Sequence, residues 1–182
     1  MTALARSAER GRAGIWVFFV SEVFLFGALL SMRFGLWGNT RPDLDQQLGL
    51  LVTSILLASS FFMYLAETAI DHDRRIIFLV SMFLTAILGI AFLIGVIGFE
   101  WGGHLQPTDG VFGSVFYAMT GLHALHVASG VLFIATIGLK GLRGNYSADD
   151  HFGVEACAIY WHFIDVVWVF FYPAIYLMGS AV

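Results

Sequence analysis

Seven carboxyl and imidazole side chains lie inside long apolar stretches of this sequence, where charge is costly. A charged side chain at the centre of a bilayer costs about 2.5 to 3.5 kcal/mol on insertion scales, so each needs a partner, a proton or a water-lined cavity. Carboxyl and imidazole groups in such places can exchange protons or link helices through hydrogen bonds. We therefore take as candidate site residues Glu22, Glu67, His123, His126, Glu155, His162 and Asp165.

Helical spacing predicts that several of these groups share faces. At 100° per residue, Glu155, His162 and Asp165 fall within an arc of about 80°. His123 and His126 lie about 60° apart on their own helix by the same reckoning. Each set is therefore expected to point in one direction, as a site between helices requires.

Depth along each helix predicts which groups meet. Counting 1.5 Å per residue from the cytoplasmic edge gives the depth of each group in the membrane. Glu67 and Glu155 are both at a depth of about 5 Å, Glu22 and His162 at about 12 to 15 Å, and His126 and Asp165 at about 20 Å, and we expect groups at equal depth to pair. Burial disfavours an ionised carboxylate, so Glu22 is expected to be neutral unless His162 or another cation lies within about 4 to 6 Å. Glu22 is thus a candidate proton-exchanging or carbodiimide-reactive group, or a simple link between two helices.

Two other interpretations of these residues stay open. Imidazole suits iron, copper and zinc, so His123, His126 and His162 could hold a b-type haem. An autonomous proton-conducting protein is the second, although no inverted repeat or helix broken midway by glycine and proline supports it. No phosphate-cradling loop or Ser-His-Asp arrangement is present, which argues against a self-contained enzyme. The remaining histidines are expected to be solvated: His72, His104 and His151.

The composition requires lipid as the solvent. Of 182 residues, 59% are apolar and 12% are charged, whereas a soluble domain has roughly 45 to 50% apolar and about 25% charged residues. Mean hydropathy is +0.83. Nine Lys and Arg residues against 13 Asp and Glu residues give no basic surface for nucleic acid.

Five apolar runs are long enough to cross a bilayer, which needs about 20 residues of helix. The runs are continuous rather than alternating with a period of two, so helices are expected and a β-barrel is not. The sequence predicts an all-α integral membrane bundle of five transmembrane helices, forming a single domain over residues 1–182. The expected spans are 14–37, 48–70, 76–99, 111–139 and 152–179.

Basic residues in the loops predict the orientation, because they accumulate on the cytoplasmic side. The side opposite the N-terminus holds only Arg33 and Arg41. We therefore expect a cytoplasmic N-terminus and an outer C-terminus. The cytoplasmic side would hold seven basic residues: Arg6, Arg10, Arg12, Arg74, Arg75, Lys140 and Arg143.

Three strings of residues resemble one family. The fifth run reads HFGVEACAIYWHFIDVVW over 151–168, the fourth contains TGLHALHV over 120–127, and the first contains SEVF over 21–24. In this content and order they resemble subunit III of haem-copper oxidases, the cytochrome c and quinol oxidase group, in its five-helix bacterial form. Helices two and three match mainly by pattern and position, and Glu67 stands where many relatives carry histidine.

The resemblance implies a non-catalytic subunit of the aerobic respiratory chain. Such a subunit packs beside catalytic subunit I, supports proton uptake during oxygen reduction, and protects the enzyme from inactivation during turnover. Haem and copper would belong to partner subunits, with no cofactor in this chain. A bound phospholipid is left open, because the two helices that complete the lipid cleft of longer relatives have no counterpart here. The implied location is the bacterial inner membrane. The accessory membrane subunit of nitric oxide reductase is similar over the same five helices and is the alternative.

Overall fold

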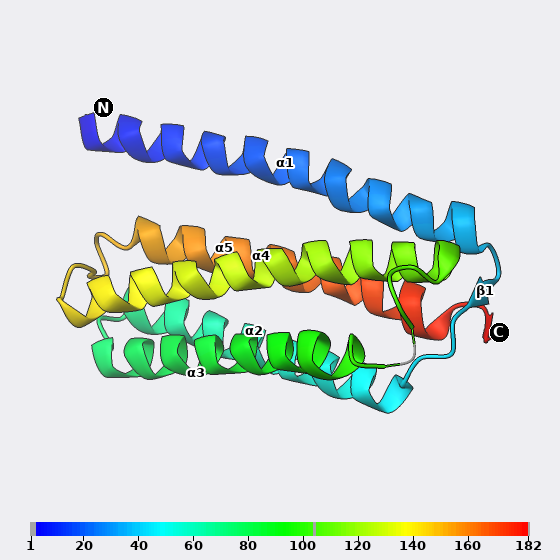
Figure 1. Ribbon diagram of the computed structural model, residues 1–182. Coiled ribbons are helices and arrows are strands. Elements are labelled where there is room, and N and C mark those ends of the chain that lie inside the picture. The colour runs from blue at the N-terminus through cyan, green and yellow to red at the C-terminus, as the bar shows by residue number, and fades with distance from the viewer. Residues whose placement is uncertain (1–2, 104, 182) are drawn as a thin grey trace.

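The computed structural model describes residues 3–103 and 105–181, with side chains from residue 13 onward. Within these residues, five helices are long and apolar enough to cross a membrane, which confirms the predicted all-α membrane fold (Figure 1). The elements are α1 (Ala3–Trp37), β1 (Thr40–Arg41), α2 (Gln46–Asp71), α3 (Arg75–Leu93), η1 (Ile94–Glu100), α4 (Gly110–Leu142), α5 (Phe152–Tyr172), η2 (Pro173–Leu177) and β2 (Ser180–Ala181).

Helices α2 to α5 form a closed ring in which each helix packs against two others. α3 lies between α2 and α4, and α5 lies between the same two helices on the other side. Large apolar side chains of α5 fill the centre, and Trp161 and Trp168 are fully buried. Their indole N–H groups donate across the ring to α2, to Ser59 Oγ and Thr53 Oγ1, each at 2.9 Å. The ring is therefore tied together through its core as well as packed.

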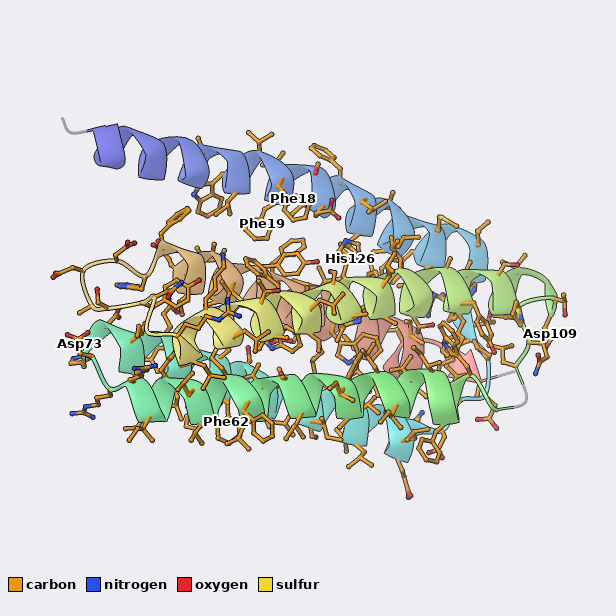
Figure 2. The ribbon with its side chains drawn as sticks, turned by 60° about the vertical axis from the view of Figure 1, so that its left-hand side comes forward. Phe18, Phe19, Phe62, Asp73, Asp109 and His126 are labelled. Carbon is orange, nitrogen blue, oxygen red and sulfur yellow. The ribbon has the colours of Figure 1, made fainter. Side chains whose placement is uncertain are left out.

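Helix α1 lies outside this ring and contacts α4 and α5. Its distance from the other helices grows toward the N-terminus (Figure 1). Phe19 is buried against Phe163 of α5, with ring centroids 4.9 Å apart. Figure 2 shows Phe19 and His126 of α4 on the side of α1 that faces the ring. Only one face of α1 thus meets the rest of the protein.

Local sequence signals set the ends of two helices. Asp45 caps α2, because its carboxylate Oδ1 accepts from the N–H groups of Gln47 and Leu48 at 2.9 and 3.0 Å. Pro173 has no N–H to continue the hydrogen-bonding pattern, and there α5 passes into the π-helical turn η2. The helix thus continues beyond Tyr172 with a different hydrogen-bonding pattern.

A parallel pair of two-residue strands joins the end of α1 to the C-terminal segment. Thr40 pairs with Ser180 and Arg41 with Ala181. Both strands lie at the end of the bundle opposite the N-terminus (Figure 1). The α2–α3 turn and the α4–α5 loop lie at the N-terminal end. One end of the bundle thus carries the basic loops, and the other carries the strand pair.

Candidate functional site

Glu22 and His126 form a hydrogen-bonded pair between α1 and α4. Glu22 Oε2 lies 3.0 Å from His126 Nε2, and each side chain is 14% exposed. His126 Nδ1 lies 2.8 Å from the backbone carbonyl of Leu122, so this nitrogen must carry a hydrogen and donate it. The Nε2···Oε2 contact then holds one proton, either on an imidazolium beside a carboxylate or on a carboxylic acid beside a neutral imidazole. This arrangement can move a proton between two atoms without moving the backbone.

The predicted pair of Glu22 with His162 is wrong. His162 Nδ1 instead lies 2.7 Å from the hydroxyl of Ser60 on α2. Depth counting compares heights along the helices but not the direction in which each face points. α1 packs against α4 and α5, and the face of α5 that carries His162 points toward α2.

The expected pair of His126 with Asp165 is also wrong, because His126 is engaged by Glu22. Asp165 is 3% exposed, and neither of its carboxyl oxygens makes a hydrogen bond within residues 3–103 and 105–181. Its polar neighbour is Ser60. Ser60 therefore lies beside two polar groups of α5, His162 and Asp165, and brings them together with α2.

His123 is fully buried among aromatic side chains. Its Nε2 donates to the carbonyl of Ile164 at 3.1 Å, and its ring lies 4.7 Å from that of Trp168 and 5.5 Å from that of Phe92. His123 and His126 thus leave α4 toward different helices, α5 and α1. The expected common direction of the two histidines is not observed, because even about 60° of rotation separates neighbours in a packed bundle.

Acidic groups and one histidine gather at the N-terminal end of the ring. The structure brings Glu67 and Glu155 within electrostatic range of each other, as their depths predict. Asp71 and His151 lie in the same electrostatic neighbourhood, and His151 Nε2 is 2.8 Å from Asp71 Oδ1. His151 was expected to be solvated, and its side chain is instead 23% exposed and paired. His72 is exposed as expected, and His104 lies outside the described residues.

The sequence did not indicate Arg33 as a buried group. It is 1% exposed, and its guanidinium donates to the carbonyls of Ala174 and Met178 at 2.6 Å each and of Gly38 at 3.1 Å. The guanidinium also lies 4.7 Å from the ring centre of Trp37. Arg33 lies at the end opposite the N-terminus, as expected, but inside α1 and covered by the C-terminal segment rather than in an exposed loop. Its place inside an apolar run was the available signal.

A second unexpected group lies at the same end. Both carboxyl oxygens of Glu100 and the hydroxyl of Tyr176 are buried and make no hydrogen bond within the described parts of the chain. They line a cavity of about 240 Å³ together with Asp45 and Leu48. This acidic cavity lies far along the helices from the Glu22 pair, near the strands.

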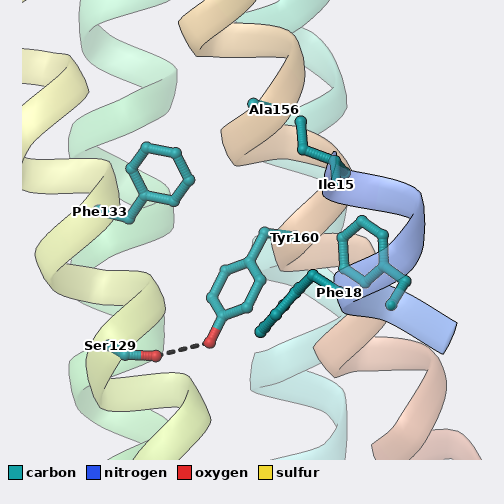
Figure 3. A pocket seen from close by; sticks show the side chains of 7 residues that line it. Ile15, Phe18, Ser129, Phe133, Ala156 and Tyr160 are labelled. Carbon is teal, nitrogen blue, oxygen red and sulfur yellow. Dashed lines mark hydrogen bonds between the residues drawn. The ribbon is translucent and has the colours of Figure 1, made fainter. Parts of the chain in front are cut away.

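An apolar pocket of about 380 Å³ lies where α1 meets α4 and α5 (Figure 3). Its polar feature is the contact between Ser129 Oγ and the Tyr160 hydroxyl, at 2.6 Å. The pocket is one to two turns from the Glu22 pair along α1 and α4. Its lining residues are Ile15, Phe18, Phe19, Ser129, Phe133, Ala156 and Tyr160.

The three membrane histidines do not converge on one point. His123 faces a carbonyl, His126 faces Glu22, and His162 faces Ser60. Within residues 3–103 and 105–181, no group of three or more His, Cys, Asp and Glu side chains could hold a metal ion. The geometry therefore does not favour the b-haem interpretation, which needs these imidazoles as ligands.

Comparison with known proteins agrees with the three sequence strings. The family model described as cytochrome c oxidase subunit III matches residues 6–180. Cytochrome c oxidase subunit 3 of Dugong dugon and that of Rhinoceros unicornis are each 36% identical, over 93% of this chain and 70% of theirs. The protein of that name from Equus caballus is 35% identical over the same shares.

These matches favour neither the nitric oxide reductase alternative nor an autonomous channel. Subunit III proteins generally carry no metal cofactor of their own. They are non-catalytic, multi-pass membrane components of a complex with other oxidase subunits. The chain belongs to the cytochrome c oxidase subunit III family.

Proposed function

We propose that this chain packs beside catalytic subunit I of a haem-copper oxidase and supports the delivery of protons to it during oxygen reduction. The observation that carries the proposal is the Glu22–His126 pair. Its two atoms lie 3.0 Å apart and each side chain is 14% exposed, on the helix whose most apolar window has the smallest share of buried residues among the described spans. A pair of this kind can accept a proton from one side and release it to another, because each atom alternates between donor and acceptor.

We further propose that the chain is a single domain of the bacterial cytoplasmic membrane, with its N-terminus inside and its C-terminus outside. Support comes from the basic residues, which lie on the N-terminal tail and on the two loops at the same end. In this orientation the Glu22 pair lies nearer the cytoplasmic surface than Arg33 does. Proton uptake from the cytoplasm is therefore the side of the reaction that the pair would serve.

Helix linking is the second role that we propose for the site residues. Glu22 with His126 joins α1 to α4, and His162 with Ser60 joins α5 to α2. Intramembrane hydrogen bonds of this kind contribute on average about 0.6 kcal/mol. The same groups can thus hold the helices in position, and each hydrogen bond contributes a small stabilisation. Further members of the proposed set are Glu67, His123, Glu155 and Asp165.

A phospholipid acyl chain is our proposed occupant of the pocket in Figure 3. The pocket is lined almost wholly by apolar side chains from three helices and opens at the surface. Tyr160 and Ser129 satisfy each other, so the pocket offers no unpaired hydroxyl that would require a polar ligand. An acyl chain there would also support the part of α1 that diverges from the ring.

The test is Glu22→Gln in the intact, purified oxidase. The substitution keeps size and hydrogen-bonding capacity but removes the titratable group. We expect an unchanged haem spectrum and subunit composition, weaker carbodiimide labelling of this chain, and several-fold fewer turnovers before inactivation. Glu100→Gln is the matched control, since it neutralises another buried carboxylate, at the end of the bundle that carries the strand pair. The proposal fails if Glu22→Gln retains the wild-type number of turnovers.

A further inference from the structure

Tyr160 of α5 touches both of the helices that carry the Glu22–His126 pair. Its ring centroid lies 6.0 Å from that of Phe18 on α1, and its hydroxyl oxygen lies 2.6 Å from Ser129 Oγ on α4. Figure 3 shows Tyr160 between these two side chains. Phe18 is one helical turn before Glu22, and Ser129 is three residues after His126. Tyr160 therefore connects α1 to α4 directly beside the pair.

The two hydroxyl groups act on the backbone of His126. Ser129 Oγ donates to the His126 carbonyl at 2.8 Å. The serine hydroxyl has a single hydrogen, so the Tyr160 hydroxyl must be the donor in its contact with Ser129. The hydrogen bonds thus run in one direction, from Tyr160 through Ser129 to the turn of α4 that carries His126. The imidazole is fixed to the same helix, because its Nδ1 donates to the carbonyl of Leu122.

Few other contacts keep Glu22 and His126 together. In the most apolar window of α1 only 11% of the residues are buried, and apolar burial drives helix association only weakly in lipid. Glu22 Oε2 and His126 Nε2 lie 3.0 Å apart, and an N–H···O hydrogen bond spans roughly 2.7 to 3.2 Å. A displacement of about 1 Å between α1 and α4 would therefore break the bond. Contacts that set this separation beside the pair decide how often it is closed.

We propose that Tyr160 is a positioning residue for the Glu22–His126 pair, and that its hydroxyl acts through Ser129 to keep His126 Nε2 within hydrogen-bonding distance of Glu22. This role rests on the proposed function, because a closed pair matters for turnover only if its proton is used there. Without the hydroxyl, the phenyl ring still contacts Phe18, but the link to the His126 turn is lost. Glu22 then spends more time without its imidazole partner.

The experiment measures the rate of carbodiimide labelling of Glu22 in the intact, purified oxidase. A carboxyl group without its imidazole partner stays neutral in lipid and leaves both oxygens open to the reagent. One hydrogen bond between transmembrane helices shifts an equilibrium by about threefold on average. Tyr160→Phe should therefore raise the labelling rate of Glu22 about threefold, with unchanged labelling of the other carboxyl groups and an unchanged haem spectrum.

Variants of Ser129 separate positioning from a general loss of packing. Ser129→Ala should raise the labelling rate as far as Tyr160→Phe does, and the double variant should raise it no further, because the two hydroxyls act as one unit. Ser129→Thr keeps a hydroxyl at an exposed position and should label at the wild-type rate. Tyr64→Phe is the matched control, since it removes a phenolic hydroxyl of α2 whose residue is 58% exposed.

Turnovers before inactivation, counted on the same variants, distinguish this role from the proposed function. Faster labelling of Glu22 with the wild-type number of turnovers would support the positioning role and contradict the use of the pair in turnover. Wild-type labelling rates in Tyr160→Phe and Ser129→Ala would overturn the positioning role, whatever Glu22→Gln does to turnover. Additive rate increases in the double variant, or an equal increase in Tyr64→Phe, would overturn it as well.

Discussion

Helix α1 and the ring of α2 to α5 are held in place in different ways. In the most apolar window of α1 only 11% of the residues are buried, against 50% in α5. The ring is organised around two buried tryptophans that also donate hydrogen bonds to α2. α1 is instead fixed at its C-terminal end by Arg33 and near its middle by Glu22. In lipid, where apolar burial drives association only weakly, a peripheral helix can be positioned by a few polar bonds.

This difference bears on function as well as on stability. A residue of the ring core cannot change its hydrogen bonds without disturbing several neighbours, because packed interiors are not continuously deformable. The Glu22–His126 pair lies at the looser junction, where few side chains must move when a proton moves. Proton exchange is therefore better suited to the α1–α4 contact than to His123, which three aromatic rings surround.

The largest effect on stability is expected from Arg33→Leu. The substitution leaves the carbonyls of Ala174, Met178 and Gly38 without their donor. A buried acceptor without a partner costs about 1 to 3 kcal/mol. Ala174 is buried whereas Met178 and Gly38 are exposed, so we expect that loss from the Ala174 carbonyl and a smaller one from each of the other two. Thermal denaturation of the purified complex measures it. Arg41→Leu is the control, since the Arg41 side chain makes one long hydrogen bond, to Pro42. Equal melting temperatures for the two variants would contradict the assigned role.

Gly89→Leu tests the packing of the ring. A Cβ at this position would lie 2.6 Å from Trp161 and 2.9 Å from Val131. Overpacking of this kind costs about 1 to 3 kcal/mol. Gly138→Leu is the matched control in the same bundle, because its Cβ meets open space. A melting temperature that falls as far for Gly138→Leu as for Gly89→Leu would mean that the ring is not packed as described.

His126→Leu should lower the stability of the complex less than the two preceding variants do. It should loosen α1 more than it loosens the other helices. The loss of one intramembrane hydrogen bond costs about 0.6 kcal/mol on average and at most about 1.7 kcal/mol. Because few other contacts hold α1, we expect faster hydrogen exchange or proteolysis along α1 without a change in α2 to α5. Exchange measured by mass spectrometry on the purified complex resolves the two regions. Uniform loosening of all five helices would contradict the separation between α1 and the ring.

His162→Leu is expected to have the smallest effect. It removes one contact, with Ser60, inside a region held by many other contacts. The expected loss is about 0.6 kcal/mol, and subunit composition should be unchanged. Loss of the chain from the purified complex would instead mean that assembly of the complex depends on the α2–α5 contact.

Sequence patterns were sufficient for the fold class and for choosing polar groups in the membrane. Continuous apolar runs can only become helices in lipid, so the five helices follow from composition. The partners were harder to predict. Depth identified the neighbourhood of Glu67 and Glu155, but Glu22 was assigned to the wrong histidine, because the choice between His126 and His162 depends on how helices are arranged around the bundle axis. No one-dimensional pattern contains that arrangement.

Arg33 shows a second limit of sequence reasoning. Its acceptors Ala174 and Met178 are 141 and 145 residues away. The turn at Pro173 and the strand pair at the end of the chain bring those carbonyls over the guanidinium. From sequence alone, an Arg near a helix end can be either an exposed charge beside a loop or a buried hydrogen-bond donor. The position of the C-terminal segment over Arg33 decides between the two.

A double-mutant cycle on the intact oxidase tests most directly whether Glu22 works through His126. Turnovers before inactivation are measured for Glu22→Gln, His126→Leu, His162→Leu and the two double variants that contain Glu22→Gln. We predict strong non-additivity for Glu22 with His126, because either substitution alone destroys the shared proton, and additivity for Glu22 with His162. Additive effects of Glu22 and His126, with coupling between Glu22 and His162, would contradict the account.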